Sequence, residues 1–178
     1  DSVEKSYGHI VPDFIVDTYD DNITLSLNNS NIPQLRVSRD FMQMLDEQAA
    51  SNNADSRNAA QFLKQKIDAA RDFINAVEQR EHTLTVTMQA IIDLQRPFFL
   101  EGDESLLRSL ILKDVAEKTG LDISTISRAT ISKYVQTNYG VFPLRYFVSD
   151  GIANAEGEEV SIKEVHNLLK ELVEGEDK

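Results

Sequence analysis

The sequence predicts a mainly α-helical protein: an extra-long helix followed by a helix-turn-helix helical domain, with a small N-terminal β-hairpin region. Apolar residues three or four positions apart over 57–95, with no Gly or Pro between them, predict the long helix. Small and apolar residues at fixed offsets over 112–129 predict the helix-turn-helix. Alternating apolar and polar residues on either side of the turn residues 19–22 predict the hairpin.

The first third of the chain predicts two strands and then a short helix. Ile23, Leu25 and Leu27 alternate with polar residues, and Ser38 is available as the N-cap of a helix over 39–49. The polar stretch 51–56 is the best candidate for a domain boundary. The expected domains are residues 1–52, 56–100 and 101–178.

The long helix has an apolar stripe that is interrupted once, at Glu81. At 1.5 Å per residue it would be about 55 Å long, which is too long for a compact domain of this size to cover. A bundle or coiled-coil stripe explains the apolar face, whereas the length suggests a spacer between two working parts. Pro97 is expected to end the helix. The stripe consists of Leu63, Ile67, Ala70, Ile74, Val77, Leu84, Met88 and Ile91.

The last third predicts helices over 106–120 and 121–135 and a strand-like apolar run over 141–148. A flexible acidic loop is expected over 151–159. Ser161 and Glu164 form a capping box ahead of a final amphipathic helix that Gly175 ends.

Charge is distributed unevenly along the chain, whose formal net charge is −12. The acidic excess lies in the first fifty residues and after 149, and residues 123–149 contain no Asp or Glu. The cations of this acid-free window are Arg128, Lys133 and Arg145. A local basic surface can bind phosphates even though the whole chain is acidic.

The helix-turn-helix pattern requires a small residue where the two helices cross, a residue tolerant of left-handed backbone at the turn, and an apolar residue that packs back. Counted from Leu112, Ala116 is fifth, Gly120 ninth and Ile126 fifteenth. Val115 and Ala129 fill further inward positions.

Asp122 is expected to cap the second helix, which would leave Ser124, Ser127, Arg128 and Ile131 facing outward. An Arg there can bond guanine O6 and N7 together, and Ser or Thr can contact base edges or phosphate. We expect Lys133 and Tyr134, one turn further on, to contact backbone phosphate and sugar.

The stretch STISRATISKYVQT resembles the signature STVSR…KYVQTPRG of the sigma-54 (RpoN-type) bacterial RNA polymerase sigma factors. The resemblance continues through most of the chain. YGHIVPDFIV and IPQLRVS resemble the end of that family's core-binding region, FINAVEQREHTL resembles its LIKSIEQRQNTL, and GVFPLRYFVSDGI resembles its GIFELKYFFSSGV.

The resemblance implies a cytoplasmic, monomeric sigma factor that binds RNA polymerase core and promoter DNA. Such a factor keeps the complex closed until an ATP-dependent, enhancer-binding activator acts. By match of motif, Arg128 would be the leading base contact at the downstream promoter element, with Ser124, Thr125, Ser127 and Lys133 in support. Arg80, on the long helix, would contribute to the block on DNA melting.

The sequence departs from the family pattern at several positions. Ile123 replaces an acidic residue, Asn138 and Tyr139 replace a Pro-Arg pair, and Pro143 replaces a Glu. These changes affect the expected base preference and loop contacts. The family's glutamine-rich first segment and its C-terminal box, ARRTVAKYRE, are both missing, so the sequence is expected to be a central fragment.

No enzyme, cofactor or metal site is expected. His9, His82 and His166 lie far apart without metal-ligand spacing, and neither a phosphate-binding loop nor a G-x-S-x-G elbow is present. No apolar run is long enough for a membrane span, and the lack of Cys fits a reducing compartment. Two alternatives remain: a helix-turn-helix repressor that dimerises through its long helix, and a protein-interaction module that does not bind DNA.

Overall fold

The computed structural model describes residues 10–28, 34–51, 53–153 and 159–161, the last six of which (151–153 and 159–161) as backbone alone. The chain divides into two compact units: residues 29–82 form one, and residues 1–28 with 83–178 form the other. The division differs from the expected ranges 1–52, 56–100 and 101–178, because it separates the N-terminal hairpin from the helix that follows it. The assignment of any range to a core-binding region remains a prediction.

The unit of residues 29–82 contains α1 (Arg39–Ala50) and the first part of α2 (Ala54–Leu94). Helix α1 begins directly after Ser38, as predicted, although the Ser38 side chain makes no capping hydrogen bond. The polar break at 51–56 falls between α1 and α2, its last three residues belong to α2, and it lies within one unit.

The extra-long helix is confirmed, since α2 is continuous over 41 residues. It ends one residue before the predicted end, and Pro97 lies in the first turn of a further short helix, α3 (Arg96–Glu101). Proline is tolerated there because the first N–H groups of a helix have no partner within it. Gly102 ends α3 in the left-handed region, at φ 73°.

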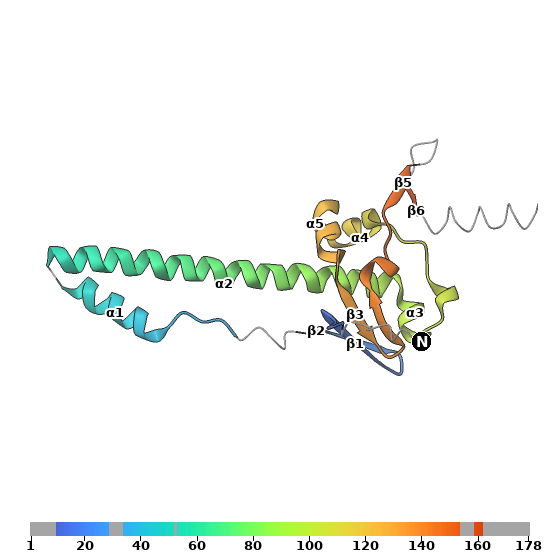
Figure 1. Ribbon diagram of the computed structural model, residues 1–178, viewed down its shortest axis with the longest axis horizontal. Coiled ribbons are helices and arrows are strands. Elements are labelled where there is room, and N and C mark those ends of the chain that lie inside the picture. The colour runs from blue at the N-terminus through green and yellow to red at the C-terminus, as the bar shows by residue number, and fades with distance from the viewer. Residues whose placement is uncertain (1–9, 29–33, 52, 154–158, 162–178) are drawn as a thin grey trace, which may run out of the picture. The chain divides into compact units, whose positions relative to one another are not determined.

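In the second unit (residues 1–28 and 83–178), a four-stranded sheet joins a hairpin from the first segment to a hairpin from the later segment (Figure 1). The predicted hairpin is β1 (Phe14–Tyr19) with β2 (Asn22–Leu27), and the second hairpin is β3 (Tyr134–Thr137) with β4 (Gly140–Pro143). Their order is β2-β1-β3-β4, because β1 pairs in parallel with β3. Phe14, Val16 and Val135 are buried, so burial of this apolar face favours the pairing.

The helix predicted over 106–120 is shorter than expected. A 3-10 turn, η1 (Glu104–Leu106), comes first, and the regular helix α4 occupies only Leu112–Thr119. Between them the backbone bonds to another segment: Ser149 N–H donates to Leu110 O at 3.0 Å, and its carbonyl accepts from Leu112 N–H at 3.2 Å. Backbone groups used in this bridge are not available to extend the helix.

The last described segments also differ from the prediction. The run at 141–148 contains β4 and a 3-10 turn, η2 (Leu144–Tyr146). The two ends of the expected acidic loop over 151–159 lie in strands, since β5 (Gly151–Ala153) pairs antiparallel with β6 (Glu159–Ser161). The rest of that expected loop, 154–158, lies outside the described residues. The expected capping box and final helix lie outside the described residues, apart from Ser161 itself.

The main core lies in the second unit, between the sheet, the end of α2, α3, α4 and a further helix, α5 (Ile123–Thr130). Phe98 is at its centre, with edge-to-face contacts to Phe142 and Phe147 at centroid distances of 5.6 and 5.3 Å. Within the described part of the chain, no helix is both long and apolar enough to cross a membrane.

Candidate nucleic-acid interface

The two helices of the predicted helix-turn-helix are α4 and α5 (Ile123–Thr130), and every inward position is filled as expected. Val115 and Ile126 are fully buried, and Ala116 and Ala129 are 7% exposed. Gly120 has a φ of 71°, and an added Cβ would meet no atom within 4 Å. The turn therefore favours glycine for its backbone conformation and not for lack of space.

Helix α5 is only eight residues long and its ends are well defined. The Asp122 carbonyl accepts from the N–H groups of Thr125 and Ile126 at 2.9 and 3.1 Å, although the Asp122 side chain makes no cap bond. At the other end, the buried Thr130 hydroxyl donates to the carbonyls of Ile126 and Ser127, both at 3.0 Å. Ser132 then adopts a positive φ of 55°, which turns the chain away from the helix.

Lys133 and Tyr134 are consequently not on α5, and the prediction of a helix through residue 135 is wrong. Tyr134 begins β3, and the reason is tertiary: Val135 pairs with Phe14 in the sheet and is completely buried. Lys133 Nζ lies 3.2 Å from Asp13 Oδ1, and Tyr134 N–H donates to Asp13 Oδ2 at 3.0 Å. Their predicted contacts with phosphate and sugar remain predictions.

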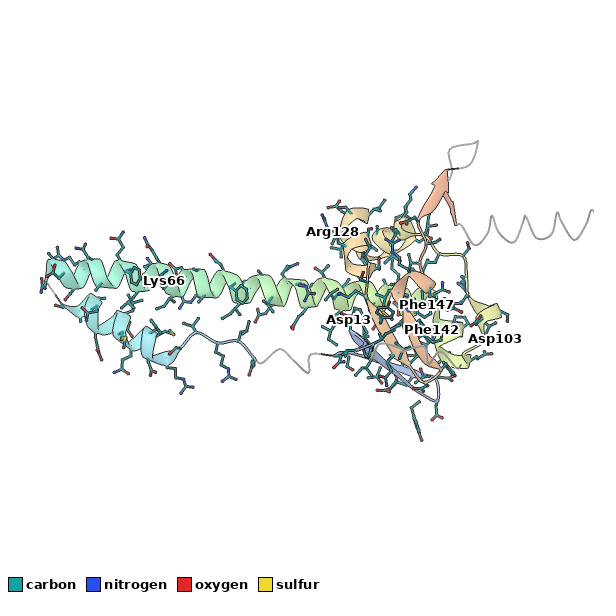
Figure 2. The ribbon with its side chains drawn as sticks, in the orientation of Figure 1. Asp13, Lys66, Asp103, Arg128, Phe142 and Phe147 are labelled. Atoms are coloured by element: carbon teal, nitrogen blue, oxygen red, sulfur yellow. The ribbon has the colours of Figure 1, made fainter. Side chains whose placement is uncertain are left out.

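The outward surface of α5 carries the other predicted contact residues. Arg128 and Ser124 are both exposed and lie one helical turn apart. Nη2 of Arg128 donates to Ser124 Oγ at 3.3 Å. Thr125 and Ser127 are half-buried beside them. Figure 2 shows Arg128 on α5, with Phe142 and Phe147 among the strands of the same unit. Ile123, at the family's acidic position, is 45% exposed.

The third cation of the acid-free window, Arg145, also reaches this surface. Its Nη2 donates to Ser127 Oγ at 3.1 Å, and its Nη1 lies 2.8 Å from Asp150 Oδ1. Sequence reasoning did not select Arg145 as a site residue. Its place in the acid-free window was the one feature of the sequence that pointed to it. Its contact with Ser127, eighteen positions earlier, is visible only in the tertiary structure.

The β3–β4 turn, which departs from the family signature, is bound to its own unit. Asn138 Nδ2 donates to Thr18 O at 2.7 Å, and the Tyr139 hydroxyl donates to Leu100 O. Residues that replace the family's Pro-Arg pair thus contribute to the internal structure of this domain.

Arg80 is exposed on the part of α2 that belongs to the unit of residues 29–82. Its predicted role in the block on melting therefore rests on the resemblance alone.

Two shifted pKa values occur near η1 and η2. Burial raises the pKa of the Tyr146 hydroxyl, and the Glu104 carboxylate, which accepts a hydrogen bond and is itself negative, adds to the rise. Hydrogen bonds from the Ser105 backbone and side chain lower the pKa of the Asp103 carboxyl. Neither group is on α5.

Comparisons with known proteins agree on one family. Residues 60–178 match the family model described as Sigma-54, DNA binding domain. The RNA polymerase sigma-54 factor of Pseudomonas aeruginosa is 36% identical over 177 residues, which is 99% of this chain and 34% of that relative. The sigma-54 factor of Escherichia coli is 30% identical over 169 residues, or 95% of this chain and 34% of its own length.

A solved structure, described as Aquifex aeolicus sigmaN bound to promoter DNA, matches with a TM-score of 0.61 and 25% identity. The match covers 98% of this chain and 49% of that one. This chain spans about a third of the length of the curated relatives that it matches. From the motif order, the helix-turn-helix geometry and these matches together, the chain belongs to the sigma-54 family and includes its DNA-binding domain.

Proposed function

We propose that this chain is the part of an RNA polymerase sigma-54 factor that reads the downstream promoter element. In this proposal α5 enters the major groove, where Arg128 bonds a guanine and Ser124, Thr125 and Ser127 contact base edges or phosphate. The observation that carries the proposal is the surface of α5: an exposed Arg128 on a helix fixed by a complete set of inward residues.

Charge supports the same proposal. Residues 123–149 contribute three cations and no carboxylate. Lys133 pairs with Asp13 and Arg145 pairs with Asp150, two carboxylates from outside this stretch. Arg128 bonds the Ser124 hydroxyl instead, so its charge remains to attract phosphate despite the acidic total. The similar proteins are sigma factors of RNA polymerase, and the similar solved structure is bound to promoter DNA. We extend both to this chain, together with a monomeric state, action in the cytoplasm and control by an ATP-dependent activator in the full-length protein.

Fluorescence anisotropy tests the proposal with two duplexes, one that carries a sigma-54 promoter and one in which the downstream element is scrambled. The chain is expected to prefer the first duplex, with an affinity that falls as salt rises. Arg128→Ala is expected to remove about 1–3 kcal/mol of binding free energy, concentrated at one base position.

Arg71→Ala is the matched control, because it removes the same charge from an exposed position in the other unit. Equal affinity of the wild-type chain for both duplexes at every salt concentration would contradict sequence reading by α5. Elution as a dimer in size-exclusion chromatography would instead favour a repressor that dimerises through α2.

A further inference from the structure

The guanidinium group of Arg145 contacts two side chains of the DNA-binding domain: Ser127 on α5, and Asp150 five positions after Arg145 itself. One arm donates to Ser127 on α5 at 3.1 Å, and the other contacts Asp150 at 2.8 Å. The Arg145 side chain is only 28% exposed, whereas that of Asp150 is 68% exposed. The guanidinium thus lies largely within the protein surface, and its partner carboxylate is at the rim.

The backbone around Arg145 is firmly anchored. Leu144, its neighbour in η2, is fully buried and donates its N–H to Lys133 O at 2.9 Å. Phe147, two residues further on, is 2% exposed. The base of the Arg145 side chain is therefore fixed to the core, so the guanidinium can hold α5 in place.

The Asp150 end is also anchored. Ser149, the preceding residue, forms the backbone bridge to Leu110 and Leu112 at the start of α4. Through Asp150, Arg145 is connected to the first helix of the helix-turn-helix, and through Ser127 it is connected to the second. A planar guanidinium can hold two partners in fixed directions, which a Lys ammonium on its flexible stem does less well.

Helix α5 needs such support because eight residues are too few for a helix that is stable by itself. Its inner face is held by Ile126 and Ala129. Ser127 lies next to Arg128 in sequence, so a bond at Ser127 restricts the rotation of α5 about its axis. That rotation sets the direction of the Arg128 side chain.

We propose that Arg145 is a positioning residue: it fixes the rotation of α5 so that Arg128 meets its base, while Asp150 holds the Arg145 guanidinium away from phosphate. The inference rests on the proposed function. Arg145 thereby contributes to discrimination between sequences and not to general affinity for DNA.

The test measures binding of the whole chain to the promoter duplex and to the scrambled duplex over a salt series. Arg145→Lys keeps the charge and loses the two-armed contact. It is expected to lower the ratio of the two affinities roughly tenfold, as the loss of charged hydrogen bonds would. Affinity for the scrambled duplex and the salt slope should stay unchanged. Asp150→Asn should lower the ratio less than Arg145→Lys does, and it should raise the affinity for the scrambled duplex. Asp46→Asn, which makes the same charge change on α1, should alter neither the ratio nor that affinity.

A double-mutant cycle separates positioning from a purely structural role. If Arg145 acts through Arg128, Arg145→Lys causes no further fall in the ratio of the two affinities when Arg128 is already replaced by Ala. Additive losses would overturn the inference, as would an unchanged affinity ratio in Arg145→Lys. A fall in the salt slope by about 0.9 in Arg145→Gln, with an unchanged ratio, would show a direct phosphate contact instead. A wild-type chain that does not discriminate between the duplexes would refute the proposed function itself.

Discussion

Gln95 offers a sharp test of how the end of α2 is joined to the DNA-binding domain. Its side chain is completely buried at the junction of α2 and α3. Its Nε2 donates to Arg108 O at 2.9 Å and to Phe147 O at 3.1 Å, and its Oε1 accepts from Arg108 N–H at 2.9 Å. One side-chain amide thus provides hydrogen-bond partners for backbone groups of two segments that are neither α-helix nor β-strand.

Replacement of this side chain leaves one N–H and two carbonyls without their partner. At about 1 kcal/mol for each hydrogen bond, and more for a buried group left unsatisfied, Gln95→Met should destabilise the unit by roughly 2–3 kcal/mol. Gln95→Ala also leaves a cavity, so we expect a total of roughly 3–4 kcal/mol. Gln89→Ala is the matched control on α2. Gln89 is exposed and, among the described residues, its side chain bonds Asp93 alone, at 2.9 Å, so its loss should change the free energy of unfolding by no more than about 0.5 kcal/mol.

Urea unfolding followed by tyrosine fluorescence measures the effect selectively. The five tyrosines all lie outside residues 29–82, so the signal reports the unit that contains Gln95. The reasoning is refuted if Gln95→Met and Gln89→Ala give the same free energy of unfolding as the wild-type chain.

Three further predictions concern the same unit. Gly120→Ala should cost about 1 kcal/mol of unfolding free energy through backbone strain alone. Gly102→Ala should cost more, because the added Cβ would also collide with the ring of Tyr139. Equal urea midpoints for the two variants would contradict this. Because the pKa of Tyr146 is raised in the folded state, its contribution to stability should be complete below pH 10.0 and be lost as pH rises above it. The free energies of unfolding of Tyr146→Phe and of the wild-type chain, measured across that pH range, check this. A difference between the two that does not change with pH would argue against it. Lys133→Ala should lower the free energy of unfolding by about 1 kcal/mol, because the Asp13 carboxylate loses its cationic partner, and the loss should vanish in an Asp13→Ala background.

The sequence by itself determined the features that depend on local pattern. A 3.6-residue apolar period, interrupted once at Glu81, predicted α2. An alternating period with turn residues predicted the first hairpin, and spacing predicted the inward positions of the helix-turn-helix. Each follows from residues near one another in the chain, since helix and strand periods decide which side chains share a face. Gly120 is the clearest case, because its position in the motif alone predicted the left-handed turn.

Only the tertiary structure decided where α5 ends and what holds it. Nothing local separates Thr130 from Tyr134 in the apolar pattern, and β3 forms there because β1, more than a hundred residues earlier, offers it a partner. The segment before α4 is extended for the same reason, since Ser149 and Gln95 bind its backbone. The contact from Arg145 to Ser127 likewise exists because the packed strands return the chain to α5. In each case the deciding hydrogen bond joins residues distant in sequence, and its strength depends on burial that local periodicity does not encode.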